Sequence, residues 1–110
     1  MSLSVRILPE ELRSIDSSTF TGSYQEIGDP LAQIACLVKF VNDTNVDVTI
    51  SWDGSTDNDF LPANSFALYD ITQQTQREAG IYISKGTQFW VKGAAGTGSV
   101  YLTVLYPAER

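Results

Sequence analysis

Apolar and polar residues alternate with a period of two over much of the chain, a pattern typical of β-strands that bury one face. The alternation is unbroken over residues 46–53, and residues 34–41 before it form a continuous apolar segment rich in branched side chains. Turn-forming residues occupy positions 42–45 between these two segments. The pattern therefore predicts a hairpin whose strands are joined by residues 42–45 around a type I turn.

Further segments have the composition of strands and are separated by polar or glycine-rich connections. They cover residues 65–71, 80–84, 88–92 and 99–106. No helical period appears, so the chain is predicted to be all-β, an antiparallel β-sandwich or a jelly-roll-like barrel of about 6–8 strands. Jelly-roll and immunoglobulin-like connections both fit this pattern. The glycine-rich residues 93–98 are expected to form a hairpin loop, because they lack the lysine and the following helix of a phosphate-binding loop.

The first part of the chain has a different composition, richer in serine, threonine and charge. We expect one domain, with an N-terminal arm and edge strands over residues 1–33 and the β-sandwich core over residues 34–110. Short strands are predicted at residues 5–8, 18–21 and 24–27. The arm either docks on a neighbouring chain or covers its own sandwich. Its apolar anchors would be Leu3, Val5, Ile7, Leu12 and Ile15.

Residues 72–79 are polar throughout and have no apolar stripe at helical spacing. They are expected to form a long exposed loop or a single short turn of helix. The loop is a second candidate contact with a partner, through Gln73, Gln74 and Gln76.

Charge and hydropathy narrow the range of partners. The 110 residues carry a net charge of −6, and the isoelectric point is near 4.3. Nucleic acid and anionic membrane surfaces are therefore not expected as partners. The chain starts without the features of a cleaved signal, and it has no apolar run of the length that spans a bilayer, so we expect a soluble protein made inside a cell.

The residue types present do not favour catalysis. The chain has no histidine and one cysteine, Cys36, so neither a histidine-activated nucleophile nor a histidine or multi-cysteine metal site can be assembled. Cys36 lies within an apolar segment and is expected to be a small buried side chain. No pair of carboxylates is marked as an acid–base couple. We therefore expect a protein that is not an enzyme and that has no cofactor.

Two groups of residues are candidate sites. Asp53, Asp57 and Asp59 supply hard oxygen ligands that could hold calcium, but their spacing is not that of an EF-hand, and a turn capped by its own carboxylates is the alternative. Trp90 is expected to point outward, where it either stacks on a sugar ring or packs against a partner subunit. Trp52 alternates in phase with the apolar residues of its strand and is predicted to lie in the core.

Several motifs between residues 35 and 106 resemble those of small virion proteins of tailed bacteriophages. The main motif reads Asn-Asp-Thr-Asn-Val-Asp-Val-Thr-Ile-Ser-Trp-Asp-Gly over residues 42–54, and Asp59-Phe60-Leu61-Pro62-Ala63 follows it. Further segments of the resemblance are residues 86–92 and 98–101. These motifs describe strands and turns rather than chemistry.

The resemblance implies a non-enzymatic β-sandwich of an assembled phage particle. It favours a capsid decoration or staple protein, made in the host cytoplasm and located on the virion, that bridges subunits of the major capsid protein. Contact with the major capsid protein or other virion proteins, and assembly into a homo-oligomer, would follow. A tail or head-to-tail adaptor component and a glycan-binding module of the virion are the alternatives, since one fold serves several roles.

Overall fold

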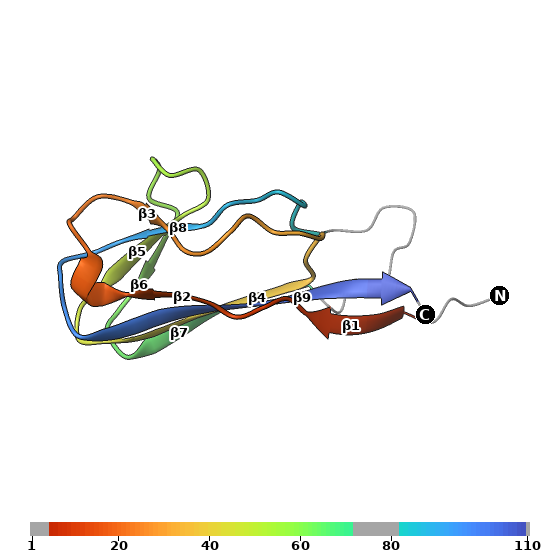
Figure 1. Cartoon of the computed structure of the whole chain (residues 1–110), viewed down its shortest axis with the longest axis horizontal. Helices are drawn as coiled ribbons and strands as arrows, with labels where there is room; N and C mark the ends of the chain where they lie inside the picture. The colour runs from red at the N-terminus through yellow and green to blue at the C-terminus, as the bar shows by residue number, and fades with distance from the viewer. Residues whose placement is uncertain (1–4, 72–81, 110) are drawn as a thin grey trace.

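The computed structural model describes residues 5–71 and 82–109, which form two antiparallel β-sheets packed face to face (Figure 1). The predicted all-β sandwich is confirmed. The strands are β1 (Val5–Pro9), β2 (Arg13–Asp16), β3 (Gln25–Glu26), β4 (Leu37–Thr44), β5 (Val48–Ser51), β6 (Asp59–Leu61), β7 (Ser65–Asp70), β8 (Trp90–Lys92) and β9 (Gly98–Glu109). One short 3₁₀ helix, η1 (Ser17–Thr19), lies between β2 and β3.

The order of the strands defines the topology. The larger sheet has the order β1-β9-β4-β7, with β2 also beside β9, and the smaller sheet has the order β3-β8-β5-β6. Since β1 and β2 pair with successive parts of β9, they act as one interrupted strand. The eight resulting strands are then arranged 1-8-3-6 in one sheet and 2-7-4-5 in the other. This arrangement is the double Greek key of a jelly roll, not an immunoglobulin-like sandwich.

The core lies between the two sheets and is built by the alternation of inward side chains. Phe40 of β4 contacts Phe89 edge to face, with ring centroids 5.3 Å apart. Phe20, Ile27 and Leu31 from the first part of the chain are buried in the same core. The other fully buried apolar residues include Val38, Val48, Ile50, Leu61, Val91, Val100, Leu102 and Val104. Three apolar residues of the first part of the chain thus belong to the core of the sandwich.

The predicted hairpin between residues 34–41 and 46–53 is wrong. β4 continues to Thr44, and it pairs with β7 and β9, whereas β5 lies in the other sheet. The inward positions of β4 are Val38, Phe40, Asn42 and Thr44, so the strand alternation persists through residues that read as turn formers. The chain crosses between the sheets after Thr44, and a local hairpin does not form.

The hydrogen bonds of Asn42 explain why this polar residue is tolerated inside the sandwich. Its fully buried side-chain amide donates hydrogen bonds to the carbonyl oxygens of Val46, Leu61 and Pro62 at 2.9–3.1 Å. The Thr44 hydroxyl donates to Asn42 Oδ1 at 2.6 Å. Because every polar atom of the amide has a partner, its burial is compatible with a stable core. The amide also links β4 of one sheet to the end of β6 in the other.

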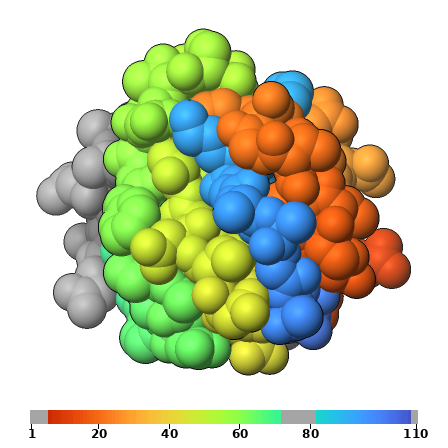
Figure 2. All heavy atoms as spheres, turned by 90° about the vertical axis from the view of Figure 1, so that its left-hand side faces the viewer, coloured from red at the N-terminus to blue at the C-terminus, as the bar shows by residue number. Residues whose placement is uncertain are grey.

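Other local predictions were also wrong. Residues 17–19 form η1 instead of a strand, and of the strand predicted at 80–84 the described residues form only one bridge, between Ile83 and Ala35. Residues 93–98 connect the two sheets and do not form a hairpin loop. Figure 2 faces the end of the sandwich at which this connection lies beside residues 17–22 and 44–48. Backbone hydrogen bonds from Gly96 N–H to Ser17 O and from Asn45 N–H to Thr97 O hold it there.

Cys36 lies half-buried just before β4, where its backbone bonds to Leu105 of β9 and to Ile71, and its thiol donates a hydrogen bond to the Leu105 carbonyl at 3.6 Å. Burial raises the pKa of this thiol above its ordinary value. A protonated thiol is a poor nucleophile, which agrees with a packing role for Cys36.

Candidate protein-binding surfaces

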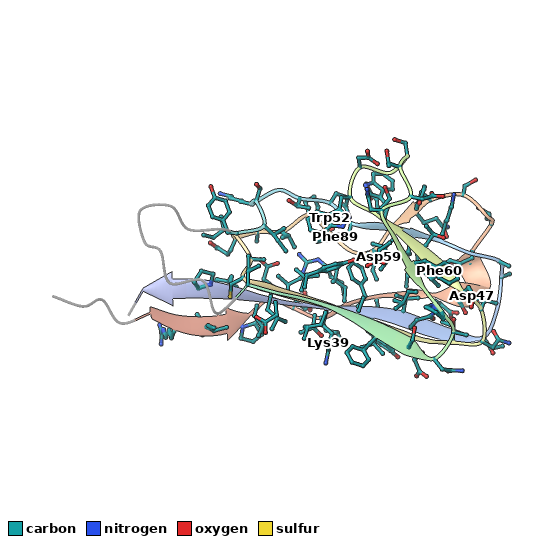
Figure 3. The ribbon with its side chains drawn as sticks, turned by 180° about the vertical axis from the view of Figure 1, so that it is seen from behind. Lys39, Asp47, Trp52, Asp59, Phe60 and Phe89 are labelled. Atoms are coloured by element: carbon teal, nitrogen blue, oxygen red, sulfur yellow. The ribbon has the colours of Figure 1, made fainter. Side chains whose placement is uncertain are left out.

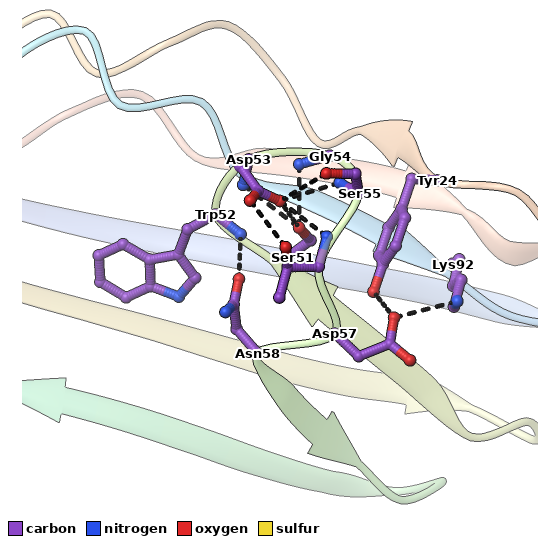
Figure 4. Close-up of polar contacts among 10 residues, drawn as sticks. Tyr24, Ser51, Trp52, Asp53, Gly54, Ser55, Asp57, Asn58 and Lys92 are labelled. Carbon is purple, nitrogen blue, oxygen red and sulfur yellow. Dashed lines mark hydrogen bonds and ion pairs between the residues drawn. The ribbon is translucent and has the colours of Figure 1, made fainter.

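The loop between β5 and β6 is closed by its own side chains. The Asp53 carboxylate accepts hydrogen bonds from the backbone N–H groups of Ser55 and Thr56 at 2.9 and 2.8 Å, and from the Ser51 hydroxyl at 2.9 Å (Figure 4). These bonds hold the pKa of Asp53 well below its usual range, with the backbone N–H of Ser55 contributing most. The loop is therefore an Asx-type turn, as one of the two sequence interpretations predicted.

The structure does not bring the three candidate calcium ligands together. The Asp57 carboxylate binds Lys92 Nζ at 3.1 Å and accepts a hydrogen bond from the Tyr24 hydroxyl (Figure 4). The Asp59 carboxylate accepts a hydrogen bond from the Tyr69 hydroxyl. Within the described ranges, no group of three acidic or cysteine side chains is arranged to hold a metal ion.

The contacts of Asp57 shift the pKa values of the groups around it. The hydrogen bond from Tyr24 is the main cause that lowers the pKa of Asp57, and the ion pair with Lys92 adds to it. Desolvation and the same hydrogen bond raise the pKa of Tyr24 to about 12. Lys92 Nζ also lies 4.6 Å from the centroid of the Tyr24 ring, a cation–π contact. These charges hold the loop against the outer face of the smaller sheet.

The position of one of the two tryptophans, Trp52, differs from the sequence prediction. Trp52 is not in the core: β5 ends at Ser51, the chain turns outward, and the Trp52 side chain is 37% exposed. Its ring makes T-shaped contacts with Phe89 and Tyr69, with centroids 4.9 and 5.7 Å away. Figure 3 shows Trp52 beside Phe89. Trp52 therefore closes the side of the core instead of filling it.

Trp90 lies half-buried on the outward side of β8, as predicted. The Gly54 backbone, with φ at +85°, packs directly on its ring, and a Cβ atom at position 54 would lie 2.8 Å from Trp90 Cε2. The protein's own loop thus covers one face of the indole, and a sugar ring could stack only on the other.

The predicted edge strand near the N-terminus is confirmed and extends past the rest of its sheet. β4 pairs with β9 as far as Leu105, whereas β1 pairs with β9 from Leu105 to Glu109. β1 and the last residues of β9 therefore continue as a two-stranded ribbon at one end of the molecule (Figure 1). We call β1 with residues 105–109 the β1–β9 ribbon.

The candidate arm residues have different positions on this ribbon and its base. Ile7 on β1 and Leu12 after it are exposed, whereas Ile15 packs against the core. Val5 is the first residue of β1, and its backbone pairs with that of Glu109. Leu3 and the loop residues Gln73, Gln74 and Gln76 lie outside the described residues.

The base of the ribbon is fastened to the sandwich by a pair of residues that the sequence analysis did not single out. Arg13 Nη2 forms an ion pair with Glu10 Oε1 at 2.8 Å, and Arg13 Nε donates to the Asp29 carbonyl at 2.8 Å. Glu10 Oε2 accepts a hydrogen bond from the Gln33 N–H at 3.0 Å. Both charged groups are largely shielded from solvent and satisfied by several partners, which is the condition for a stabilising ion pair.

Comparison of the sequence with protein-family models and with curated proteins finds no match. The described residues include no helix long and apolar enough to cross a membrane. The resemblance to phage virion proteins thus depends on the sequence motifs alone.

Proposed function

We propose that the chain is a non-enzymatic structural protein of a phage virion, a capsid decoration protein that bridges subunits of the major capsid protein. The observation that carries the proposal is the β1–β9 ribbon, which extends past the sandwich with Ile7 exposed and Leu12 at its base. The sequence motifs over residues 42–54 and 59–63 supply the class of particle.

The ribbon has the properties of a docking element. Edge strands carry unpaired backbone N–H and C=O groups that can add to a strand of a partner, and exposed apolar side chains beside them supply buried area. The Glu10–Arg13 ion pair and its hydrogen bonds to Asp29 and Gln33 tie the base of the ribbon to the sandwich. A docking element that is already ordered loses less conformational entropy on binding than a flexible arm does.

The proposal is tested by co-sedimentation of the full chain with capsids and, separately, with tails purified from a phage that encodes it. Ile7→Asp and Leu12→Asp are each expected to weaken capsid binding at least tenfold, because a carboxylate is costly to bury in an apolar contact. Phe60→Asp is the matched control: Phe60 lies on β6, away from the ribbon, and is 58% exposed, as Leu12 is.

The outcomes separate the candidate roles. Equal capsid binding by Ile7→Asp, Leu12→Asp and the unaltered chain would contradict docking through the ribbon. Binding to tails but not to capsids would assign the chain to the tail or the head-to-tail junction. Substitution is preferable to deletion of residues 1–15, because that deletion would also remove β2 and the Arg13 contacts that fasten the N-terminal segment.

A further inference from the structure

The outer face of the larger sheet carries adjoining exposed apolar side chains on β7, β4 and β9. On β7, Phe66 and Leu68 point away from the core and are 65% and 48% exposed. The outward residues of β4 and β9 beside them include Val41 and Tyr101. Exposed apolar side chains that adjoin on one sheet face indicate a surface that another protein covers.

The strand register places the residues of this face in rows. Phe66 of β7 is opposite Val41 of β4, and Val41 is opposite Tyr101 of β9, so these three form one row across the sheet. A hollow of about 410 Å³ lies along this row, lined in part by Val41, Phe66 and Tyr101. We call the outward side chains of this row and its neighbours the outer apolar face.

Two side chains of opposite charge lie on β4, one on each side of the Phe66–Val41–Tyr101 row. Lys39 and Asp43 are on β4, each two residues from Val41 and on the same outward side. Lys39 points away from the smaller sheet (Figure 3). Among the described residues, neither side chain has an ion-pair partner. A second molecule that closes over this surface removes water from both groups, and the contact is favourable where it brings an opposite charge to each of them.

We propose that the outer apolar face binds a second copy of this chain, about a two-fold axis parallel to the Phe66–Val41–Tyr101 row. This axis places the row of one molecule opposite the same row of the second molecule. The β4 strands of the two molecules then run in opposite directions. Lys39 of each copy then lies opposite Asp43 of the other, and the symmetry forms this pair twice. The proposal is independent of the role proposed for the β1–β9 ribbon.

Charge selects this orientation over the other face-to-face arrangement. A two-fold axis parallel to β4 would keep each residue at the same height along the strand, so Lys39 would oppose Lys39 of the second copy. Like charges opposite each other in a closing apolar contact are unfavourable. The residues at this face therefore favour antiparallel β4 strands across the interface.

The area of the outer apolar face determines how tightly the two copies are expected to bind. Three strands spaced about 4.8 Å apart and about six residues at 3.4 Å each cover an area of about 15 by 20 Å. This area, about 300 Å² per copy, is smaller than the roughly 600 Å² per partner of the smaller specific complexes. We therefore expect a weak, reversible dimer whose dissociation constant is on the order of 100 μM.

Sedimentation velocity of the full chain over a range of concentrations tests the proposal. The unaltered chain is expected to shift from monomer to dimer as concentration rises. Lys39→Glu alone and Asp43→Lys alone should each raise the dissociation constant at least tenfold, because each places like charges opposite one another at both contacts. An equimolar mixture of the two variants should restore the dimer, because a carboxylate at position 39 then meets an amine at position 43 and the reverse pair is also opposite in sign.

A matched control and a fold check accompany this measurement. Lys85→Glu makes the same change of charge in an exposed turn away from this face and should leave dimerisation unchanged. Thermal melts monitored by circular dichroism verify that each variant is folded. A chain that stays monomeric at all concentrations, single variants that dimerise as the unaltered chain does, or a mixture that stays monomeric would each overturn the proposal. None of these results bears on capsid binding by the ribbon.

Discussion

At the scale of single residues, polar side chains inside or beside the sandwich determine the connections between strands. Asn42 and Thr44 occupy inward positions of β4, and the hydrogen bonds of the Asn42 amide cross to the other sheet. Asp53 closes the neighbouring loop through backbone N–H groups. In both cases a short polar side chain replaces a backbone partner where the chain leaves a strand.

We expect Asn42→Ala to lower the free energy of unfolding by about 2–4 kcal/mol, because buried carbonyl groups would lose their donor and the Thr44 hydroxyl one of its two acceptors. Urea denaturation followed by tryptophan fluorescence measures this change. Gln33→Ala, at an exposed position, should change stability by less than about 0.5 kcal/mol. A similar small effect for both variants would contradict the structural role assigned to Asn42.

The lowered pKa of Asp53 gives stability a defined pH dependence. A carboxylate whose pKa is lower in the folded protein stabilises the fold above its unfolded pKa, about 3.9, and this stabilisation is lost as the pH falls through the folded pKa. Asp53→Asn should therefore reduce the urea midpoint at pH 7 and flatten its decrease below pH 4. Glu11→Gln removes an equal charge from an exposed side chain outside this loop. An unchanged slope in Asp53→Asn would show that the turn does not depend on the charged form.

At the scale of elements, the N-terminal segment is joined to the sandwich by close packing as well as by pairing with β9. Gly28 has φ at +70°, and a Cβ atom there would lie 2.5 Å from Arg13 Cγ. Arg13 cannot move aside without breaking its hydrogen bond to Asp29 and its ion pair with Glu10. The loop and the base of the β1–β9 ribbon thus depend on each other.

A comparison of Gly28→Ala with Gly22→Ala separates the cost of displacing Arg13 from the cost of placing an alanine at positive φ. Both glycines have positive φ, but a Cβ atom at position 22 would meet nothing within 4 Å. We expect Gly22→Ala to cost about 1 kcal/mol of unfolding free energy and Gly28→Ala about 2–3 kcal/mol, since it adds the displacement of Arg13. Chemical denaturation of the two variants provides the comparison, and equal losses would mean that Arg13 is not held in place.

The elements that the sequence predicted well are those with uninterrupted alternation, such as β5, β7 and β9. The assignment of β4 and β5 to different sheets could not be predicted, because it depends on partners distant in sequence and on the satisfied burial of Asn42 and Thr44. The Asx turn at Asp53 was predictable from local chemistry, since its bonds reach only two and three residues ahead. The contacts of Arg13 with Asp29 and of Glu10 with Gln33 could not be predicted, because these residues are 16 and 23 positions apart in the sequence.

At the scale of the whole molecule, the two proposed contacts lie on different surfaces. The ribbon is at one end, and the outer apolar face covers one side of the larger sheet. The row of Phe66, Val41 and Tyr101 combines strands separated by much of the chain, so only the three-dimensional register shows it. A dimer through this face would carry two ribbons and could contact two capsid subunits at once, which raises avidity without a larger interface.

The central position of β9 also determines the order in which the protein can fold. β1 and β2 pair only with β9, so two strands made early in synthesis have their sheet partner near residues 98–109. Pairing over such sequence separations closes large loops and is slow. While the ribosome is still making the chain, β1 and β2 have no strand to join in this sheet. The larger sheet is therefore completed only after β9 has emerged, and until then the nascent chain carries exposed strand edges that are prone to aggregate.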